Sequence, residues 1–211
     1  MPNEKFKNRF RIPSARATWH NYNAGTYFVT ICTQNREHCF GEIVTDGNGE
    51  PKMVLSEIGG YAQQQIKNAK IQYPYAEFPL WVVMPNHVHA IVRIDKTKNL
   101  HNFRDAPVET MCTSSLQQTS TSFQQKNRWK NNVVNEQLQS ISRQRGLLST
   151  VIGGLKRAIT RFANDHAIPF AWQTRFHDHI VRNTNELNRI ATYIQNNVAQ
   201  WDSDKYHDSL L

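Results

Sequence analysis

Two apolar runs of strand length, separated by a joint of two residues, constrain the fold of this chain more than any other feature. The runs are Leu80–Met84 and His87–Ile94, and Pro85-Asn86 lies between them. Because so short a joint returns the chain beside itself, the runs are predicted to pair as an antiparallel hairpin. Thr26–Thr33 is rich in β-branched and aromatic residues, so it is predicted to be another strand, with Cys39–Val44 as its partner.

Three further segments carry apolar residues at helical spacing. The first runs from Leu55 to Ala69 and contains Gly59-Gly60, a pair that weakens a helix but permits close packing. The second begins near Ser149 and has an apolar face with a basic opposite side. The third is predicted to begin at Asn183, with Glu186 as its capping-box partner. Together with the strands, these helices predict an α+β fold.

The chain divides into an arm, one domain and an insertion. Residues 1–16 carry five basic residues against one acid, which predicts a basic N-terminal arm. Residues 17–211 are predicted to form one domain. Within it, residues 96–145 are rich in Gln, Ser, Thr and Asn without a period, which predicts a flexible insertion. Residues 172–182 are predicted to form a turn and a short strand before the last helix.

Charge points to a nucleic-acid partner. The 211 residues include 25 Lys and Arg against 17 Asp and Glu, a net charge of +8. Such a surplus is typical of nucleic-acid binders. The predicted phosphate contacts are Lys156, Arg157, Arg161, Arg11 and Arg16. Trp172 is open to two interpretations, stacking on unpaired bases or packing in the core.

Cysteine content and hydropathy indicate the compartment. The three cysteines are an odd number without the spacing of a zinc or redox motif, which favours a reducing compartment. No apolar run has the length of a membrane span, so no membrane partner is predicted. We therefore expect a cytoplasmic protein associated with the nucleoid.

A histidine pair on the second strand of the hairpin is the candidate metal site. Successive side chains of a strand point to opposite faces, so His87 and His89 share a face while Val88 points into a core. We expect both imidazoles to face a shared open pocket, where they could bind a divalent ion. The alternative is a pair of hydrogen-bonded histidines without metal. His177-Asp178-His179 repeats the spacing around a charged residue and is predicted to be structural.

The last helix offers a tyrosine beside an asparagine. Tyr193 and Asn197 are four residues apart, so they are neighbours at the margin of the apolar face. The Tyr193 hydroxyl could attack phosphorus next to a metal, and the Asn197 amide oxygen could bind that metal. The alternative is a half-buried tyrosine with its hydroxyl in water.

Taken together, these motifs resemble a known family. The order is Met-Pro-Asn-His-Val-His at residues 84–89, then Asp-His-Ile-Val-Arg at 178–182 and Tyr-Ile-Gln-Asn-Asn at 193–197. This order is similar to that of the REP-associated tyrosine transposases, which belong to the tyrosine-HUH transposases of single-stranded insertion sequences. The resemblance runs from about residue 26 to residue 201 and omits 96–145. One departure is Val198, where the family usually has proline.

The resemblance implies a fold, a reaction and roles for residues. The family has a ferredoxin-like antiparallel β-sheet with helices on one side, and its tyrosine lies on the C-terminal helix. By resemblance, His87, His89 and Asn197 bind Mg²⁺ or Mn²⁺ and Tyr193 is the catalytic nucleophile. The implied activity is a metal-dependent endonuclease and strand transferase, a transposase that acts on single-stranded or hairpin DNA through a 5′-phosphotyrosine.

Three questions stay open at this stage. A replication-initiator or relaxase nickase shares the histidine pair and the tyrosine, although its flanking signatures differ. A domesticated protein that binds DNA hairpins without cutting them is a second alternative. The resemblance also leaves the oligomeric state open between a monomer and a homodimer.

Overall fold

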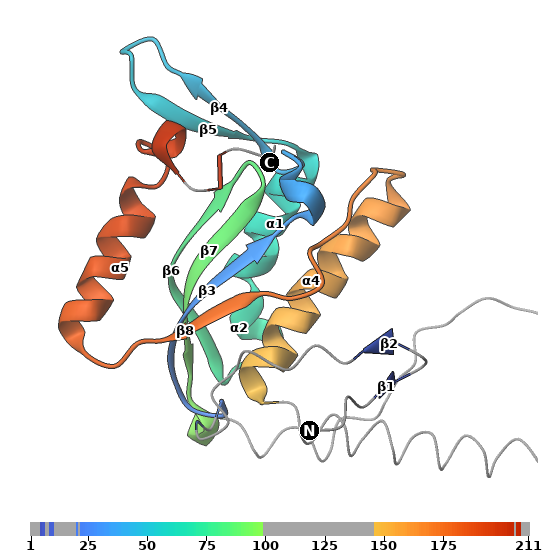
Figure 1. The fold of residues 1–211 in the computed structure, drawn as a ribbon, viewed down its shortest axis with the longest axis vertical. Helices are drawn as coiled ribbons and strands as arrows, with labels where there is room; N and C mark the ends of the chain where they lie inside the picture. The colour runs from blue at the N-terminus through green and yellow to red at the C-terminus, as the bar shows by residue number, and fades with distance from the viewer. Residues whose placement is uncertain are drawn as a thin grey trace, which may run out of the picture.

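A four-stranded antiparallel sheet forms the centre of the molecule (Figure 1). The computed structural model describes residues 5–6, 9–10, 20, 22–98, 146–204 and 206–207. The strand order in the sheet is β6 (Ala76–Met84), β7 (His87–Ile94), β3 (Gly25–Cys32) and β8 (His177–Ile180). Among the described residues, α1 and α2 lie between β3 and β6 in the chain and α4 lies between β7 and β8, which is the predicted ferredoxin-like arrangement. The predicted hairpin of β6 and β7 is confirmed.

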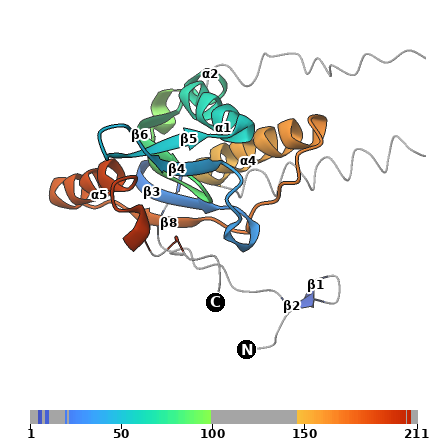
Figure 2. The same cartoon turned by 90° about the horizontal axis from the view of Figure 1, so that it is seen from above.

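Helices cover both faces of this sheet. On one face, the side chains of Val29, Val88 and Val92 pack in the main core with α1 (Glu57–Lys67) and α4 (Leu147–Asp165). On the other face, Ile91 packs against α5 (Thr184–Asn196) in a smaller apolar cluster. Figure 2 shows α5 on the opposite side of the sheet from α1 and α4. The expectation of helices on one side is therefore wrong for α5, because the apolar side chains of the sheet alternate between two faces.

The strand predicted to pair with β3 belongs to a separate hairpin. β4 (Gly41–Thr45) pairs with β5 (Pro51–Leu55), and this hairpin projects from the body of the molecule (Figure 1). Both edges of β3 are already occupied by β7 and β8. The turn at residues 46–49 closes β4 onto its nearest neighbour in sequence, so local pairing decides the partner.

Side-chain caps mark the starts of α1 and α5, and the start of α5 is the one predicted from the sequence. Ser56 caps α1, since its hydroxyl accepts a hydrogen bond of 3.2 Å from the Gly59 backbone N–H. Asn183 caps α5 by accepting from the Glu186 N–H at 2.9 Å. The Glu186 carboxylate reaches the Arg182 N–H at 2.8 Å, one residue before the cap. The short α2 (Ala69–Gln72) follows α1.

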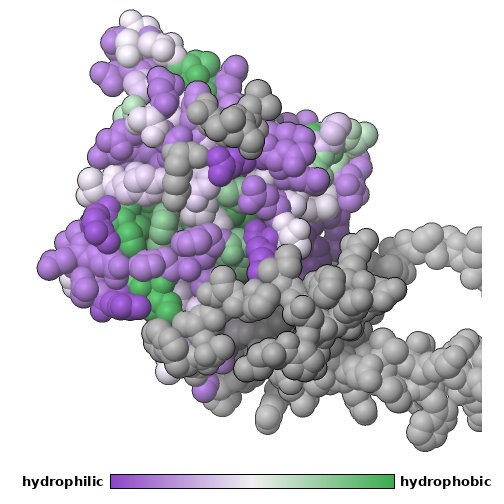
Figure 3. Space-filling model, in the orientation of Figure 1, coloured by the Kyte–Doolittle hydropathy of each residue, from purple (hydrophilic) through white to green (hydrophobic). Residues whose placement is uncertain are grey.

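Most of the predicted arm and insertion lies outside the described residues. In the arm, β1 (Lys5–Phe6) pairs with β2 (Arg9–Phe10). At the start of the insertion, residues 96–98 form the short helix η2 (Lys96–Lys98). Within the described ranges, no helix has the length and hydropathy needed to span a membrane. The face in Figure 3 carries mostly hydrophilic residues, with small separate hydrophobic areas.

Candidate active site

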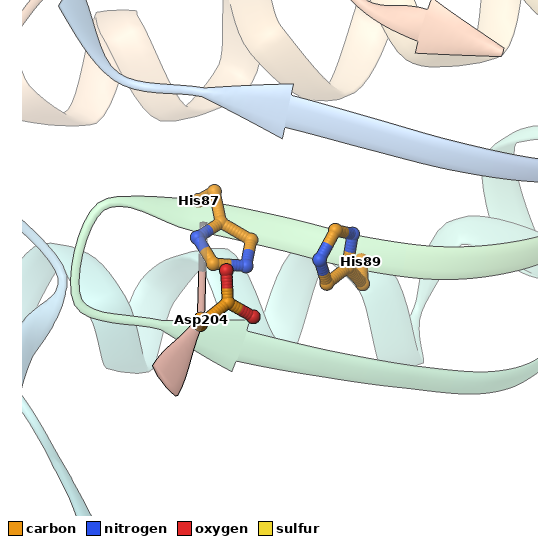
Figure 4. Close-up of side chains that lie close together, drawn as sticks. All are labelled: His87, His89 and Asp204. Atoms are coloured by element: carbon orange, nitrogen blue, oxygen red, sulfur yellow. The ribbon is translucent and has the colours of Figure 1, made fainter. Parts of the chain in front are cut away.

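The histidine pair lies on β7 with both rings on the α5 side of the sheet. The ring centroids of His87 and His89 are 4.3 Å apart (Figure 4). Val88, between them, packs in the main core. The predicted shared face is confirmed. The predicted open pocket is wrong, because His87 is 0% and His89 1% exposed. Residues that follow α5 cover the rings: the Tyr206 ring centroid lies 4.6 Å from that of His87 and 5.5 Å from that of His89.

Hydrogen bonds orient each imidazole. Asn86 Nδ2 donates to the Tyr206 carbonyl oxygen at 2.7 Å, which fixes the Asn86 amide so that its oxygen faces the neighbouring ring. His87 Nδ1 donates to that Asn86 oxygen at 2.8 Å, so the lone pair of a neutral His87 is on Nε2. His89 Nδ1 is hydrogen-bonded to Thr30 Oγ1 at 2.9 Å. Such partners on one ring nitrogen are what fixes a histidine for metal binding through the other.

Tyr193 brings its hydroxyl to the histidine pair from α5. The Tyr193 hydroxyl oxygen lies 3.2 Å from His89 Nε2 and donates to Asp204 Oδ2 at 3.1 Å. The ring packs edge-on against Phe28, with centroids 6.1 Å apart. Burial, and then the Asp204 carboxylate, raise the pKa of Tyr193 well above its usual value. In this arrangement the phenol keeps its proton.

Asp204 is the site residue that the sequence analysis missed. One ligand atom each from His87, His89 and Asp204 lie within 4.8 Å of one another, so this group could hold a metal ion (Figure 4). Asp204 follows the short helix η3 (Trp201–Ser203). The sequence there has no helical or strand periodicity from which the direction of this side chain could be predicted. Two imidazoles and a carboxylate suit Mn²⁺ and similar divalent ions.

Asn197, the predicted third ligand, lies directly beside Asp204. Its side chain is 1% exposed, and its Nδ2 donates to Asp204 Oδ2 at 2.8 Å. Its Oδ1 is buried and has no hydrogen-bond partner within the described part of the chain. A buried amide oxygen without a partner is costly, and a bound cation would satisfy it. These residues therefore fit a divalent ion, because Asp204 and Asn197 add oxygen atoms to the two imidazole nitrogens.

The residues of α4 that are predicted to contact DNA do not lie at this site. Arg157 and Arg161 are exposed on α4, which packs on the opposite face of the sheet. Lys156 is half-buried, and its Nζ donates to the Gln173 carbonyl oxygen at 2.6 Å and lies 5.6 Å from the centroid of the Trp172 ring. Burial lowers the pKa of Lys156. Arg11 and Arg16 lie outside the described residues.

Trp172 and His179 of the second histidine motif make structural contacts away from the histidine pair. Trp172 packs against Phe40, with ring centroids 5.4 Å apart, which favours the core interpretation. His179 Nε2 is bonded to the Glu186 carboxylate at 2.7 Å, a contact that ties β8 to the start of α5. His177 is exposed on β8.

Comparisons with known proteins find a sequence relative and several structural neighbours, two of which are described below. No protein-family model matches the chain. A protein of Haemophilus influenzae Rd, described as uncharacterized, is 29% identical over 196 residues, or 92% of each chain. The structure of a REP-associated tyrosine transposase bound to a REP hairpin matches at 19% identity with a TM-score of 0.43, over 88% of this chain and 72% of that one. A candidate transposase from Deinococcus radiodurans R1 matches at 12% identity with a TM-score of 0.36, over 88% and 97%.

The first of these structures belongs to the family that the sequence motifs indicate.

Proposed function

We propose that this chain is a metal-dependent endonuclease and strand transferase for single-stranded DNA, of the tyrosine-HUH transposase type, with Tyr193 as its nucleophile. The observation that carries the proposal is the 3.2 Å approach of the Tyr193 hydroxyl to His89 Nε2, across 104 residues of sequence. A helix tyrosine and a histidine pair, each a weak signal alone, converge on one buried polar site. The motif order gives independent support.

The proposed reaction is an in-line displacement at phosphorus. The Tyr193 oxygen forms a bond to the phosphorus atom, and the bond from phosphorus to the 3′ oxygen breaks. The products are a 5′-phosphotyrosine and a strand that leaves with a free 3′-hydroxyl. The Tyr193 proton would pass along its hydrogen bond to Asp204 Oδ2, and the departing 3′ oxygen would take up a proton from water to become the hydroxyl. Because the phosphodiester bond is exchanged and not hydrolysed, a 3′-hydroxyl can reverse the reaction and rejoin DNA without ATP.

His87, His89 and Asp204 would hold the divalent ion, Mg²⁺ or Mn²⁺, and the amide of Asn197, which is hydrogen-bonded to Asp204, would supply a further oxygen ligand. When bound, such an ion supplies a Lewis acid that neutralises the charge of the phosphate and favours the phenolate. The site needs this help, because burial raises the pKa of Tyr193. The hydrogen bonds on His87 Nδ1 and His89 Nδ1 keep both rings in place for it.

The proposed partner is hairpin-flanked single-stranded DNA, in line with the family resemblance and the net charge of +8. One alternative, a domesticated hairpin-binding protein, would bind this DNA but form no covalent product. A nickase of the initiator or relaxase type shares the histidine pair and the tyrosine but has other flanking signatures.

A labelled hairpin oligonucleotide, incubated with the protein and Mg²⁺ or Mn²⁺ and run on a denaturing gel, tests the proposal. The wild-type protein is expected to form a covalent adduct that a chelator prevents. Tyr193→Phe removes only the phenolic oxygen, so it is expected to bind the oligonucleotide and form no adduct. His87→Ala is expected to form none either, because the metal site loses a ligand. DNA binding by the wild-type protein with no adduct under either metal would overturn the proposal.

A further inference from the structure

The turn after β3, η1 (Gln34–Arg36), holds two consecutive non-glycine residues in the left-handed region. The φ angles are 52° at Asn35 and 56° at Arg36. Asparagine visits this region readily, but arginine does so rarely. Such conformations persist only where the surrounding structure fixes them, and they concentrate at functional sites. What this turn positions is therefore of interest.

Hydrogen bonds attach the turn to the joint that precedes the histidine pair. The backbone N–H and the hydroxyl of Thr33 both donate to the Asn86 carbonyl oxygen at 2.9 Å. On the far side of the turn, the Phe40 N–H donates to the Pro85 carbonyl oxygen at 2.9 Å. In the sheet, Cys32 is the register partner of His87. The position of Arg36 relative to His87 is thus set by a short and rigid path.

The guanidinium of Arg36 and the histidine pair all lie beside the ring of Tyr206. Its Cζ is 5.3 Å from the centroid of the Tyr206 ring. The same ring also lies beside His87 and His89, at centroid distances of 4.6 and 5.5 Å. Both imidazoles are buried, and the Tyr206 ring is one of the groups that lie against them. Displacement of this ring would open a space that adjoins both Arg36 and the two histidines.

We propose that Arg36 binds a non-bridging oxygen of the phosphate that Tyr193 attacks, and that it exchanges the Tyr206 ring for this phosphate when DNA enters. This inference rests on the proposed function. Arginine is suited to the role because its planar, permanently charged group donates two parallel hydrogen bonds to a phosphate. The turn positions that charge before DNA binds. A positioned charge favours catalysis more than a mobile surface cation does.

Three variants test the role of this side chain. Arg36→Gln removes the charge, Arg36→Lys keeps the charge without the planar fork, and Lys67→Gln is the matched control. Lys67 is exposed on α1, on the opposite face of the sheet from the histidines. In adduct formation with a labelled hairpin oligonucleotide, Arg36→Gln is expected to be about 100-fold slower, Arg36→Lys intermediate, and Lys67→Gln unchanged. Equal rates for Arg36→Gln and Lys67→Gln would overturn the inference.

A neutral phosphate separates charge recognition from a structural role. Once the cleavage position is mapped, a methylphosphonate at that position removes the negative charge. On this oligonucleotide, Arg36→Gln is expected to slow adduct formation by less than about 5-fold, since the ion pair with the phosphate no longer exists. A penalty of unchanged size, or a drop in melting temperature of Arg36→Gln, would show that Arg36 only supports the turn.

Binding in the Tyr193→Phe background distinguishes this inference from the proposed function. Absence of an adduct with the wild-type protein overturns the proposed function alone. Fluorescence anisotropy with the hairpin oligonucleotide still measures the phosphate contact, and Arg36→Gln is expected to weaken binding about 10-fold relative to Lys67→Gln. Equal affinities in that comparison would contradict the role of Arg36.

Discussion

Each imidazole of the pair is held by a hydrogen bond on Nδ1, so that both Nε2 atoms face the same buried space. A lone histidine variant therefore removes a ligand without disturbing the sheet hydrogen bonds of β7. His87→Ala is expected to lower the affinity for Mn²⁺ at least about 100-fold, measured by isothermal titration calorimetry of the protein without DNA. His177→Ala is the control, because His177 is exposed on β8. Equal Mn²⁺ affinity in both variants would refute the metal site.

Residues on regular elements could be placed from the sequence, and residues outside them could not. His87, His89 and Tyr193 could be predicted because strands and helices have fixed periods, and a period assigns a side chain to a face. Asp204 could not, because it follows η3 in a segment whose direction depends on tertiary contacts. The burial of the histidines has the same origin, since the covering ring of Tyr206 belongs to that segment.

At the scale of elements, described residues after α5 cover the histidine pair. The Trp201 ring stacks at 6.1 Å from His87, and the Tyr206 carbonyl oxygen is bonded to Asn86. Tyr206→Ala is expected to expose the histidine pair. Diethylpyrocarbonate with peptide mass spectrometry measures this: His87 and His89 react slowly in the wild-type protein and faster in the variant, while exposed His177 reacts equally in both. Fast modification of the pair in the wild-type protein would contradict the closed arrangement.

The two adjacent glycines of α1 give a matched test of packing. A Cβ at Gly59 would overlap the Phe40 carbonyl oxygen, whereas a Cβ at Gly60 meets nothing within 4 Å. Gly59→Ala is expected to destabilise the protein by about 1–3 kcal/mol through this clash. Gly60→Ala is expected to stabilise it by about 0.5–1 kcal/mol, because alanine favours a helix. Urea unfolding of both variants measures the difference, and destabilisations of equal size would show that the helix packs differently.

At the scale of the whole molecule, the sheet separates the larger apolar core from the candidate site. The larger core lies with α1 and α4, and the polar site lies with α5 on the other face. The α+β class and most strands could be predicted, because their signals are local runs and caps. The partner of β4 and the placement of α5 could not, since both depend on which edges and faces of the sheet remain free.

The central claim is that Tyr193 is the residue that becomes covalently attached to DNA. The site contains a rival, because the Tyr206 ring also lies beside the histidines. The most direct measurement is to incubate the wild-type protein with a hairpin oligonucleotide and Mn²⁺, digest the adduct with nuclease and protease, and locate the phosphorylated tyrosine by mass spectrometry. The account predicts modification on the α5 peptide at Tyr193. Modification at Tyr206 or at any other tyrosine would contradict it.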